Sequence, residues 1–471
     1  MKRRSILMGI AAAGAVPVVA SCSSGSDTAQ ANAAGLSESS GHIKEGTAIT
    51  EVFGNGQRLT AVALKYDTTI DRSKVSMSSF KVADRTVTNV YTNTSAAKAG
   101  HGTDGEYVII ELSPADKAAA VYEDSFTNPT TSSSSSQQQP SGQPSGPPSG
   151  SASGKKGGGM SSGATLKKAV ATVTQTGTVT TTGGTAYAAS SGSVKTSKVV
   201  NLVVDDFHQG LKYKDADTGQ SIQYNLFVPK DYDANKSYPM VLFMHDAGTV
   251  SSNPLITLTQ GLGAVIWAMP SEQAKRECFV LAPQFTGESD EGSDGNATAL
   301  KTIKGLVDSV TGKYAGIDTD RLYTTGQSGG AMTSIALDFT YPDLFAASFL
   351  VAGQWGDLDK VKPLAKQNIW AVVSQGDETA YPGMTGIMDT LAKQGAKISR
   401  AVWDGQLTPS EFAPLAAEVR AKNTPINFTP LKKGTVVWPG LAESSVDNHI
   451  CTWRAAYTVE GIRDWLFQQK K

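Results

Sequence analysis

The sequence has little charge and almost no excess of either sign. Charged residues make up 18% of its 471 residues, and 42 basic side chains stand against 43 acidic ones, for a formal net charge of −1. Binding to nucleic acid or to an anionic membrane surface depends on clustered positive charge, so this balance indicates no such partner. Serine, threonine and glycine supply much of the polar surface instead, as is common in exported proteins.

Several cofactor signatures are also missing. We find no zinc-site spacing, no glycine-rich phosphate-binding loop and no dinucleotide fingerprint. We therefore expect neither a cofactor nor a metal. One acidic group follows a predicted strand, and we expect it to form a solvated loop, with a site for a cationic substrate or a divalent ion as the alternative. Its members are Glu288, Asp290, Glu291 and Asp294.

Cysteine is scarce, with three residues in the chain. Cys22 belongs to the N-terminal segment described next. Cys278 and Cys451 remain, and in an oxidising compartment two such cysteines can pair. A disulfide and two buried free thiols are both open at this point.

The first 22 residues have the pattern of an export signal. Basic residues 2–4 precede an apolar run from Ile6 to Ala20, too short to be a spanning helix of the mature protein. Val19-Ala20-Ser21-Cys22 looks like a bacterial lipobox, in which the lipidated Cys22 becomes the new N-terminus. Both twin-arginine (Tat) and Sec export fit the basic segment, and residues 23–45 read as a flexible tether. We expect a lipid-anchored, extracytoplasmic protein of the bacterial cell envelope.

Residues 127–163 separate two β-type stretches. This segment is rich in Ser, Pro, Gly and Gln and has few apolar side chains to offset the entropy of ordering, so we expect it to be disordered. Strand-like runs at 59–64, 86–91 and 107–112 precede it and indicate a β-sandwich. The β-type stretch after it is too short to fold alone. We therefore expect one sandwich over 46–204, with 127–163 inserted in a loop.

From residue 205 to residue 471, strands alternate with helices. Residues 240–244 form a continuous apolar run, typical of a parallel strand covered on both faces. Apolar residues at helical spacing recur at Leu300, Ile303, Val307, Val310 and Tyr314. This alternation predicts a mostly parallel, doubly wound sheet with helices on both faces.

The most informative motif is Gly326-Gln327-Ser328-Gly329-Gly330. A bare G-x-S-x-G arises readily by chance in a glycine-rich chain, so its surroundings matter. A strand-like run, 321–325, precedes it and a helix-compatible run, 331–337, follows. Strand, sharp turn and helix are the context of a nucleophile elbow, where glycines let the backbone turn and expose the serine. We predict that Ser328 is a nucleophile.

A serine nucleophile needs a base to take its proton and an acid to orient that base. Among five histidines, only His449 follows Ser328 in the chain, and the order serine, acid, histidine is that of α/β-hydrolases. We predict His449 as the base, in a loop between the last strand and a final helix over 452–468.

The acid should follow the strand 369–373, at the carboxyl end of the sheet. Gly376-Asp377-Glu378 stands there. Asp377 is our prediction, with Glu378 as the reserve. Asp447 lies too near His449 in the sequence to be favoured, but it stays open.

An oxyanion hole is expected from two backbone N–H groups. One belongs to the residue after the nucleophile, Gly329, and the other to the loop after the earlier strand, at Ala247 or Asp246. We expect His245 to shape that loop by hydrogen bonding.

The stretch 404–448 is too long for a simple connection, which takes about 2–6 residues. Within it, Thr408-Pro409-Ser410-Glu411 matches a capping box with proline at the first helical position. We expect this stretch to pack over or beside Ser328, with a structural excursion remote from the site as the alternative. Its candidates for an acyl pocket are Phe428, Val436, Val437 and Trp438.

These motifs resemble those of a known family. Residues 205–468 look like bacterial α/β-hydrolase-fold esterases related to the prolyl-oligopeptidase and polyhydroxybutyrate-depolymerase groups, on Tyr224–Pro229, Asp320–Tyr323, the elbow, and His449 with Thr452-Trp453. Residues 46–204 look like the immunoglobulin-like N-terminal domain of a subset of them. The resemblance implies an α/β-hydrolase fold, a mostly parallel doubly wound sheet, preceded by an immunoglobulin-like β-sandwich.

The same resemblance implies a serine esterase that works through an acyl-enzyme on a small-molecule or polymeric ester. Many relatives have His-Gly where this chain has His245-Asp246, and His-Gly-x-x-Asp around the acid, where this chain reads Ser374-Gln375-Gly376-Asp377-Glu378. Two alternatives stay open. One is a serine peptidase of the prolyl-oligopeptidase type, and the other is a surface binding or adhesion lipoprotein with an inert hydrolase domain.

Overall fold

A computed structural model describes residues 41–124, 164–287, 291–438 and 443–471. All of them belong to one compact unit, Ser37–Lys471. The expected export signal with Cys22, nearly all of the tether and the whole insertion 127–163 lie outside the described residues. The expected tether, 23–45, ends too late, because strand β1 already begins at Ile43.

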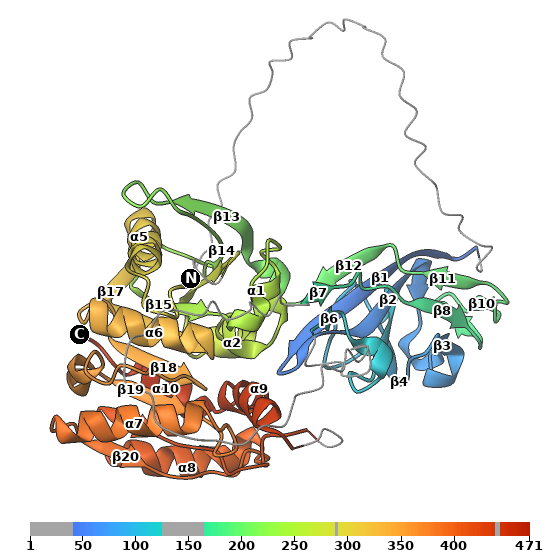
Figure 1. The fold of residues 1–471 in the computed structure, drawn as a ribbon. Coiled ribbons are helices and arrows are strands. Elements are labelled where there is room, and N and C mark those ends of the chain that lie inside the picture. The colour runs from blue at the N-terminus through green and yellow to red at the C-terminus, as the bar shows by residue number, and fades with distance from the viewer. Residues whose placement is uncertain (1–40, 125–163, 288–290, 439–442) are drawn as a thin grey trace, which may run out of the picture. The chain divides into compact units, whose positions relative to one another are not determined.

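The N-terminal part is a β-sandwich of two unequal sheets (Figure 1). The larger sheet has the order β12-β1-β2-β5-β4, and the smaller has the order β11-β8-β3. Apolar side chains from both sheets, such as Val62 and Val108 from one and Val82 and Val173 from the other, share one core. The bounds are β1 (Ile43–Phe53), β2 (Gly56–Ile70), β3 (Phe80–Val82), β4 (Val87–Asn93), β5 (Gly105–Leu112), β8 (Thr172–Gln175), β11 (Ser193–Lys195) and β12 (Lys198–Asn201).

Strands from both sides of 127–163 pair with each other. β8 is antiparallel to β3, and β12 is parallel to β1. The short β6 (Tyr122–Glu123) pairs with β7 (Thr165–Leu166) across the same gap. A last short pair is formed by β9 (Val179–Thr180) and β10 (Ala186–Tyr187), and the 3-10 turns of this part are η1 (Arg72–Lys74), η2 (Met77–Ser79), η3 (Lys117–Ala119) and η4 (Val204–Asp206).

The C-terminal part is built on a nine-stranded sheet of order β13-β14-β16-β15-β17-β18-β19-β21-β20. β13 and β14 are antiparallel, and the seven strands from β16 to β20 run parallel to one another. The bounds are β13 (His208–Lys214), β14 (Ser221–Phe227), β15 (Tyr238–Met244), β16 (Phe279–Gln284), β17 (Ile317–Gln327), β18 (Ala347–Val351), β19 (Ile369–Val372), β20 (Ile398–Arg400) and β21 (Ile426–Phe428).

The sheet is covered on both faces, as the apolar run in β15 predicts. Val241 and Phe243 point into one core, and Met240, Leu242 and Met244 point into the other. Helices α5, α6 and α7 pack on the second core, and α8, α9 and α10 pack on the first. The chain is therefore an α/β-hydrolase fold preceded by an immunoglobulin-like β-sandwich. The longer helices are α5 (Ala297–Lys313), α6 (Gly329–Thr340), α7 (Ala380–Lys393), α8 (Pro409–Ala421), α9 (Ser445–Ala456) and α10 (Glu460–Phe467).

Short helical turns connect these elements and fill the loop regions. They are η5 (Ala247–Thr249), α1 (Ile256–Thr259), α2 (Leu262–Val265), η6 (Ile266–Ala268), α3 (Pro270–Gln273) and η7 (Lys362–Lys366). In the described ranges, no helix combines the length and the apolarity that a membrane crossing needs. Cys278 and Cys451 are buried free thiols, which decides between the two open alternatives.

Two predictions about the C-terminal end are wrong. The expected single helix over 452–468 is two helices, α9 and α10, and His449 lies within α9 instead of in a loop before it. Helix α9 starts early because the Ser444 hydroxyl accepts a hydrogen bond from the Asp447 backbone N–H, 3.0 Å away, as an N-cap.

Residues 404–438 contribute helix α8 and strand β21 (Ile426–Phe428) to the hydrolase fold. Helix α8 has the expected capping box but buries Phe412, Ala416 and Val419 in the core beside α10. The chain then enters the sheet as β21, between β19 and β20. A three-residue strand is too short to show a periodicity in sequence, which is why β21 was not predicted.

Candidate active site

Ser328 sits at the tight turn between β17 and α6. Its backbone has φ 52° and ψ −118°, an unfavourable conformation for a residue with a side chain. The residues two positions before and after it must be glycine, because a Cβ on Gly326 would lie 2.3 Å from the Gly330 carbonyl carbon, and one on Gly330 would lie 2.1 Å from the Met244 oxygen. This close packing of strand and helix holds the serine in a strained turn, the geometry of a nucleophile elbow.

Three residues far apart in the chain form one hydrogen-bond relay. His449 Nε2 lies 2.8 Å from Ser328 Oγ, and His449 Nδ1 lies 2.5 Å from Asp377 Oδ2. Asp377 follows β19 in the loop before α7, so three separate elements supply the relay. With Nδ1–H donated to a carboxylate, Nε2 is left to accept the serine proton.

The environment of Asp377 favours its charged form. Burial by itself would raise the pKa of this carboxyl, which is 2% exposed, but the hydrogen bond and charge of His449 outweigh it. The backbone N–H groups of Thr379 and Ala380 also donate to Oδ1, at 3.1 and 2.8 Å. Together these groups hold the pKa of Asp377 below its ordinary value.

The two alternative acids have other partners. Glu378 is exposed, and its backbone N–H donates to Ser445 Oγ at 2.9 Å. The Asp447 carboxylate accepts a hydrogen bond from Ser444 Oγ at the start of α9. Neither carboxylate is the one that contacts His449.

The expected oxyanion-hole groups lie close to each other. A Cβ built on Gly329 would be 3.2 Å from the Ala247 nitrogen, so the Ala247 amide closely approaches the residue after Ser328. The same Cβ would lie 2.1 Å from Glu291 Oε1. Glu291 is fully buried, so the expectation of a solvated loop is wrong for this residue, whereas Asp294 is exposed as expected. Glu288 and Asp290 lie outside the described residues. Periodicity gives no signal for this placement, because Glu291 lies 38 residues from Gly329 in an irregular stretch.

Hydrogen bonds from several neighbouring residues fix the positions of His245 and Asp246. The buried ring of His245 contacts the Asp246 carbonyl and Thr249 Oγ1 through Nδ1, and its Nε2 accepts from the Phe285 N–H at 2.9 Å. Burial lowers the pKa of His245 to about 4, so the ring is neutral near pH 7. His245 is thus bonded within its own loop and to β16's end, and it is no part of the Ser328 relay.

Asp246 stands at the position where many of the esterases that the sequence resembles have glycine. It is nearly fully buried, and its Oδ2 accepts from Gln327 Nε2 at 3.0 Å. Burial raises the pKa of Asp246, although the Gln327 hydrogen bond opposes this. Gln327 Nε2 also donates to Gln260 Oε1 at 3.1 Å. The residue just before Ser328 therefore links the loop of Ala247 to the end of α1, a role that no sequence pattern signalled.

A cavity of about 450 Å³ opens beside the relay. Three kinds of groups line it: the relay itself, the Ala247 loop, and apolar or amide side chains from α6, α7, α9 and the loop after β18. Among the last are Met332, Gln354, Ala380, Val446, Ile450 and Trp453. No described residue between 404 and 438 lines it, so the expected cover from Phe428, Val436, Val437 and Trp438 is wrong. Phe428 and Val436 are instead buried in the two cores.

Across the described ranges, no group of three or more His, Cys, Asp or Glu residues could hold a metal ion. The groups that converge on the cavity are a serine, an imidazole, a carboxylate and backbone amides. This set can perform acyl transfer by a serine nucleophile without a further group.

Comparison with known proteins extends the picture of both halves. Residues 45–188 match a family model described as the esterase Ig-like N-terminal domain. A crystal structure of a thermostable esterase is similar over 91% of this chain and all of its own length, with 25% identity and a TM-score of 0.70. That likeness supports the same two-part fold.

Among curated proteins, acetylxylan esterase A of Aspergillus ficuum is 26% identical over 181 residues, which are 34% of this chain and 56% of that protein. Acetylxylan esterase A of Emericella nidulans is 24% identical over 186 residues, 36% of this chain and 59% of that protein. The chain thus spans a little over half the length of these relatives.

Proposed function

We propose that this protein is a serine hydrolase that cleaves carboxylic esters through an acyl-enzyme. The observation that carries the proposal is the relay from Ser328 through His449 to Asp377 beside a cavity of about 450 Å³. Similarity to an esterase structure over nearly the whole chain supports it. Neither the peptidase nor the adhesion alternative has an observation of its own in the described residues.

In the proposed reaction, His449 Nε2 takes the proton of Ser328 as Oγ attacks the ester carbonyl carbon. Asp377 keeps the imidazole in the tautomer that presents a free Nε2 and stabilises the imidazolium that forms. The N–H groups of Ala247 and Gly329 stabilise the developing oxyanion, and each such donor is typically worth about 100- to 1000-fold in rate. His449 then protonates the leaving alcohol, and water repeats the sequence to release the acid.

We include short acyl groups among the substrates, because the curated relatives that the chain matches are acetylxylan esterases. The cavity walls near Ser328 carry small residues, Ala352 and Ala380, next to the flexible Met332. A panel of p-nitrophenyl esters with acyl chains from acetate to laurate measures the preference.

A fluorophosphonate probe tests the nucleophile, because it reacts covalently only with an activated serine. Wild-type protein should be labelled, and Ser328→Ala should lose both labelling and ester hydrolysis. Ser445→Ala changes another serine that lines the cavity and should still be labelled. Hydrolysis by Ser328→Ala at the wild-type rate would end the proposal.

We also propose, from the N-terminal sequence alone, that the enzyme is exported and anchored through lipidated Cys22 outside the bacterial cytoplasmic membrane. Expression of the full chain with radiolabelled palmitate should label the protein and place it in the membrane fraction. Cys22→Ala should lose the label and leave that fraction. A labelled Cys22→Ala protein would contradict the proposed anchor.

A further inference from the structure

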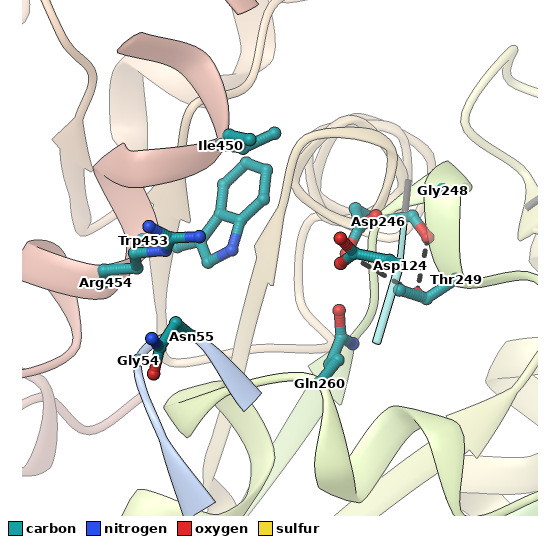
Figure 2. Close-up of a pocket in the computed structure, with 10 residues that line it drawn as sticks. All are labelled: Gly54, Asn55, Asp124, Asp246, Gly248, Thr249, Gln260, Ile450, Trp453 and Arg454. Atoms are coloured by element: carbon teal, nitrogen blue, oxygen red, sulfur yellow. Dashed lines mark hydrogen bonds between the residues drawn. The ribbon is translucent and has the colours of Figure 1, made fainter. Parts of the chain in front are cut away.

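A second, smaller recess adjoins the catalytic cavity. It measures about 30 Å³ and shares Asp246, Gly248, Ile450 and Trp453 with the catalytic cavity. In Figure 2, Trp453, Arg454 and Asn55 stand on one side of it, Asp246, Asp124 and Thr249 on the other, and Gln260 below. The recess therefore continues the active site toward the β-sandwich, whose strands β1 and β6 precede Asn55 and Asp124.

The turn at Gly54 and Asn55, between β1 and β2 of the sandwich, packs closely against helix α9. Gly54 lies so close to α9 that an added Cβ would be 3.0 Å from Arg454 Cβ and 3.1 Å from Arg454 Cα. Asn55 Oδ1 accepts a hydrogen bond from Arg58 Nε at 3.2 Å, which orients its amide. The Asn55 side chain is thus a fixed wall of the recess.

The charges in the recess favour a neutral occupant. Arg454 would repel a cation, and the Asp124 carboxylate would repel an anion; the two charges also interact with each other. The buried Asp246 adds a carboxyl whose pKa burial raises. Carboxyl, amide and guanidinium groups together both donate and accept, which suits a hydroxyl group because it also does both.

Gln260 adds an amide to the wall of the recess. Its side chain is 7% exposed, and its Oε1 accepts a hydrogen bond from Gln327 Nε2. Covering polar groups with an occupant that cannot form hydrogen bonds is costly. An alkyl chain could not pair with the amide, carboxyl and guanidinium groups of the recess, whereas a hydroxyl could.

The recess lies on the side of the leaving group. His449, which protonates the leaving alcohol in the proposed mechanism, is on α9, and Trp453 is four residues further along the same helix face. The His449 and Trp453 rings contact each other edge to face, with centroids 5.4 Å apart. An alcohol whose ester oxygen is at His449 can therefore extend along α9 toward Trp453 and Arg454.

We propose that this recess binds one free hydroxyl group of the alcohol portion of the substrate, so that the preferred substrates are acyl esters of polyhydroxy alcohols, carbohydrates among them. The proposal rests on the esterase function proposed above. At about 30 Å³ the recess is far smaller than the catalytic cavity of about 450 Å³, so it has room for a small group such as a hydroxyl and excludes a whole sugar ring. The ring itself would occupy the larger cavity.

Two acetate esters of equal size test this directly. 2-Hydroxyethyl acetate and propyl acetate differ only in a terminal hydroxyl in place of a methyl group. Wild-type enzyme should have the higher kcat/KM for the hydroxylated ester. Asn55→Leu, which removes a polar wall at nearly constant volume, should lower the ratio of the two kcat/KM values by about 3- to 10-fold, as expected for one hydrogen bond.

The control is Asn89→Leu, at an exposed position of β4 in the same sandwich, which should keep the wild-type ratio. Gly54→Ala provides a second variant, because its Cβ must move the turn away from Arg454, and it should also lower the ratio. A wild-type ratio near one, or an unchanged ratio in both variants, would overturn the hydroxyl site. Failure of the esterase proposal is distinguishable, because then neither ester would be hydrolysed in a Ser328-dependent way.

Discussion

Asp338 carries a buried carboxyl on α6, the helix that begins right after Ser328. It is 2% exposed, and its Oδ2 accepts a hydrogen bond from Ser348 Oγ on β18 at 2.7 Å. Burial raises the pKa of Asp338 from 3.8 to about 7, although the Ser348 hydrogen bond opposes the shift. We predict that Asp338→Asn makes the protein more stable, and that the gain depends on pH.

The sign of the pH dependence follows from the pH range in which the folded and the unfolded chain each keep the Asp338 proton. Below about pH 4, Asp338 is protonated in both folded and unfolded chains, and ionisation costs the fold nothing. As pH rises from 4 to 7, the unfolded chain loses the proton and the folded chain keeps it, so stability falls by about 1.4 kcal/mol per pH unit. Above pH 7 the full cost is present, at most about 4 kcal/mol for a shift of roughly three units.

Asparagine has the same shape and no charge, so Asp338→Asn removes that cost and can still bond Ser348. At roughly 1–2 °C per kcal/mol for a domain of several hundred residues, Tm should rise by about 4–8 °C at pH 8.5 and by little at pH 4.5. Thermal melts followed by circular dichroism measure both. Asp343→Asn, at an exposed position soon after the same helix, controls for the change in net charge. A gain of equal size at both pH values, or a loss at pH 8.5, would refute the reasoning.

Two further predictions concern the relay and the sheet. Asp377→Asn should lower kcat for ester hydrolysis by about 10⁴-fold, because it leaves the imidazole in the wrong tautomer, whereas Glu378→Gln should keep a kcat near wild type. Steady-state kinetics on p-nitrophenyl acetate measure both variants. A large loss in Glu378→Gln and a small one in Asp377→Asn would show that Glu378 is the acid. Deleting residues 404–438 should prevent folding, because it removes β21 from inside the sheet together with α8; soluble, cooperatively melting protein with altered ester preference would instead support a dispensable cover.

The sequence is most predictive where a short local pattern carries the physics. An apolar run such as residues 240–244 is typical of a strand covered on both faces, and the flanks of Ser328 indicate an elbow. Ser328 and Asp377 each follow a parallel strand, and the carboxyl ends of such strands meet at one edge of the sheet, which is why their proximity could be predicted.

What the sequence does not reveal depends on packing between distant segments. The burial of Glu291 against Gly329, and the approach of Gly54 to Arg454, join residues with no shared periodicity. The start of α9 is readable in principle, because Ser444 and Asp447 have the spacing of a helix cap, but the same Asp447 is also a candidate catalytic acid by its place near His449. A single carboxylate can serve either role, and only its neighbours decide between them.

The links between the recess and the catalytic serine suggest how a hydroxyl there would act on rate. Gln327, the residue before Ser328, bonds both Asp246 and Gln260, and Asp246 directly precedes the oxyanion amide of Ala247. A hydroxyl held by Asp246 would therefore stiffen the two segments that must align for the oxyanion to be stabilised. Binding energy from a group remote from the bond that breaks is then realised in the transition state. On this argument, the hydroxyl of a polyhydroxy ester raises kcat, and a purely spatial fit would lower KM alone.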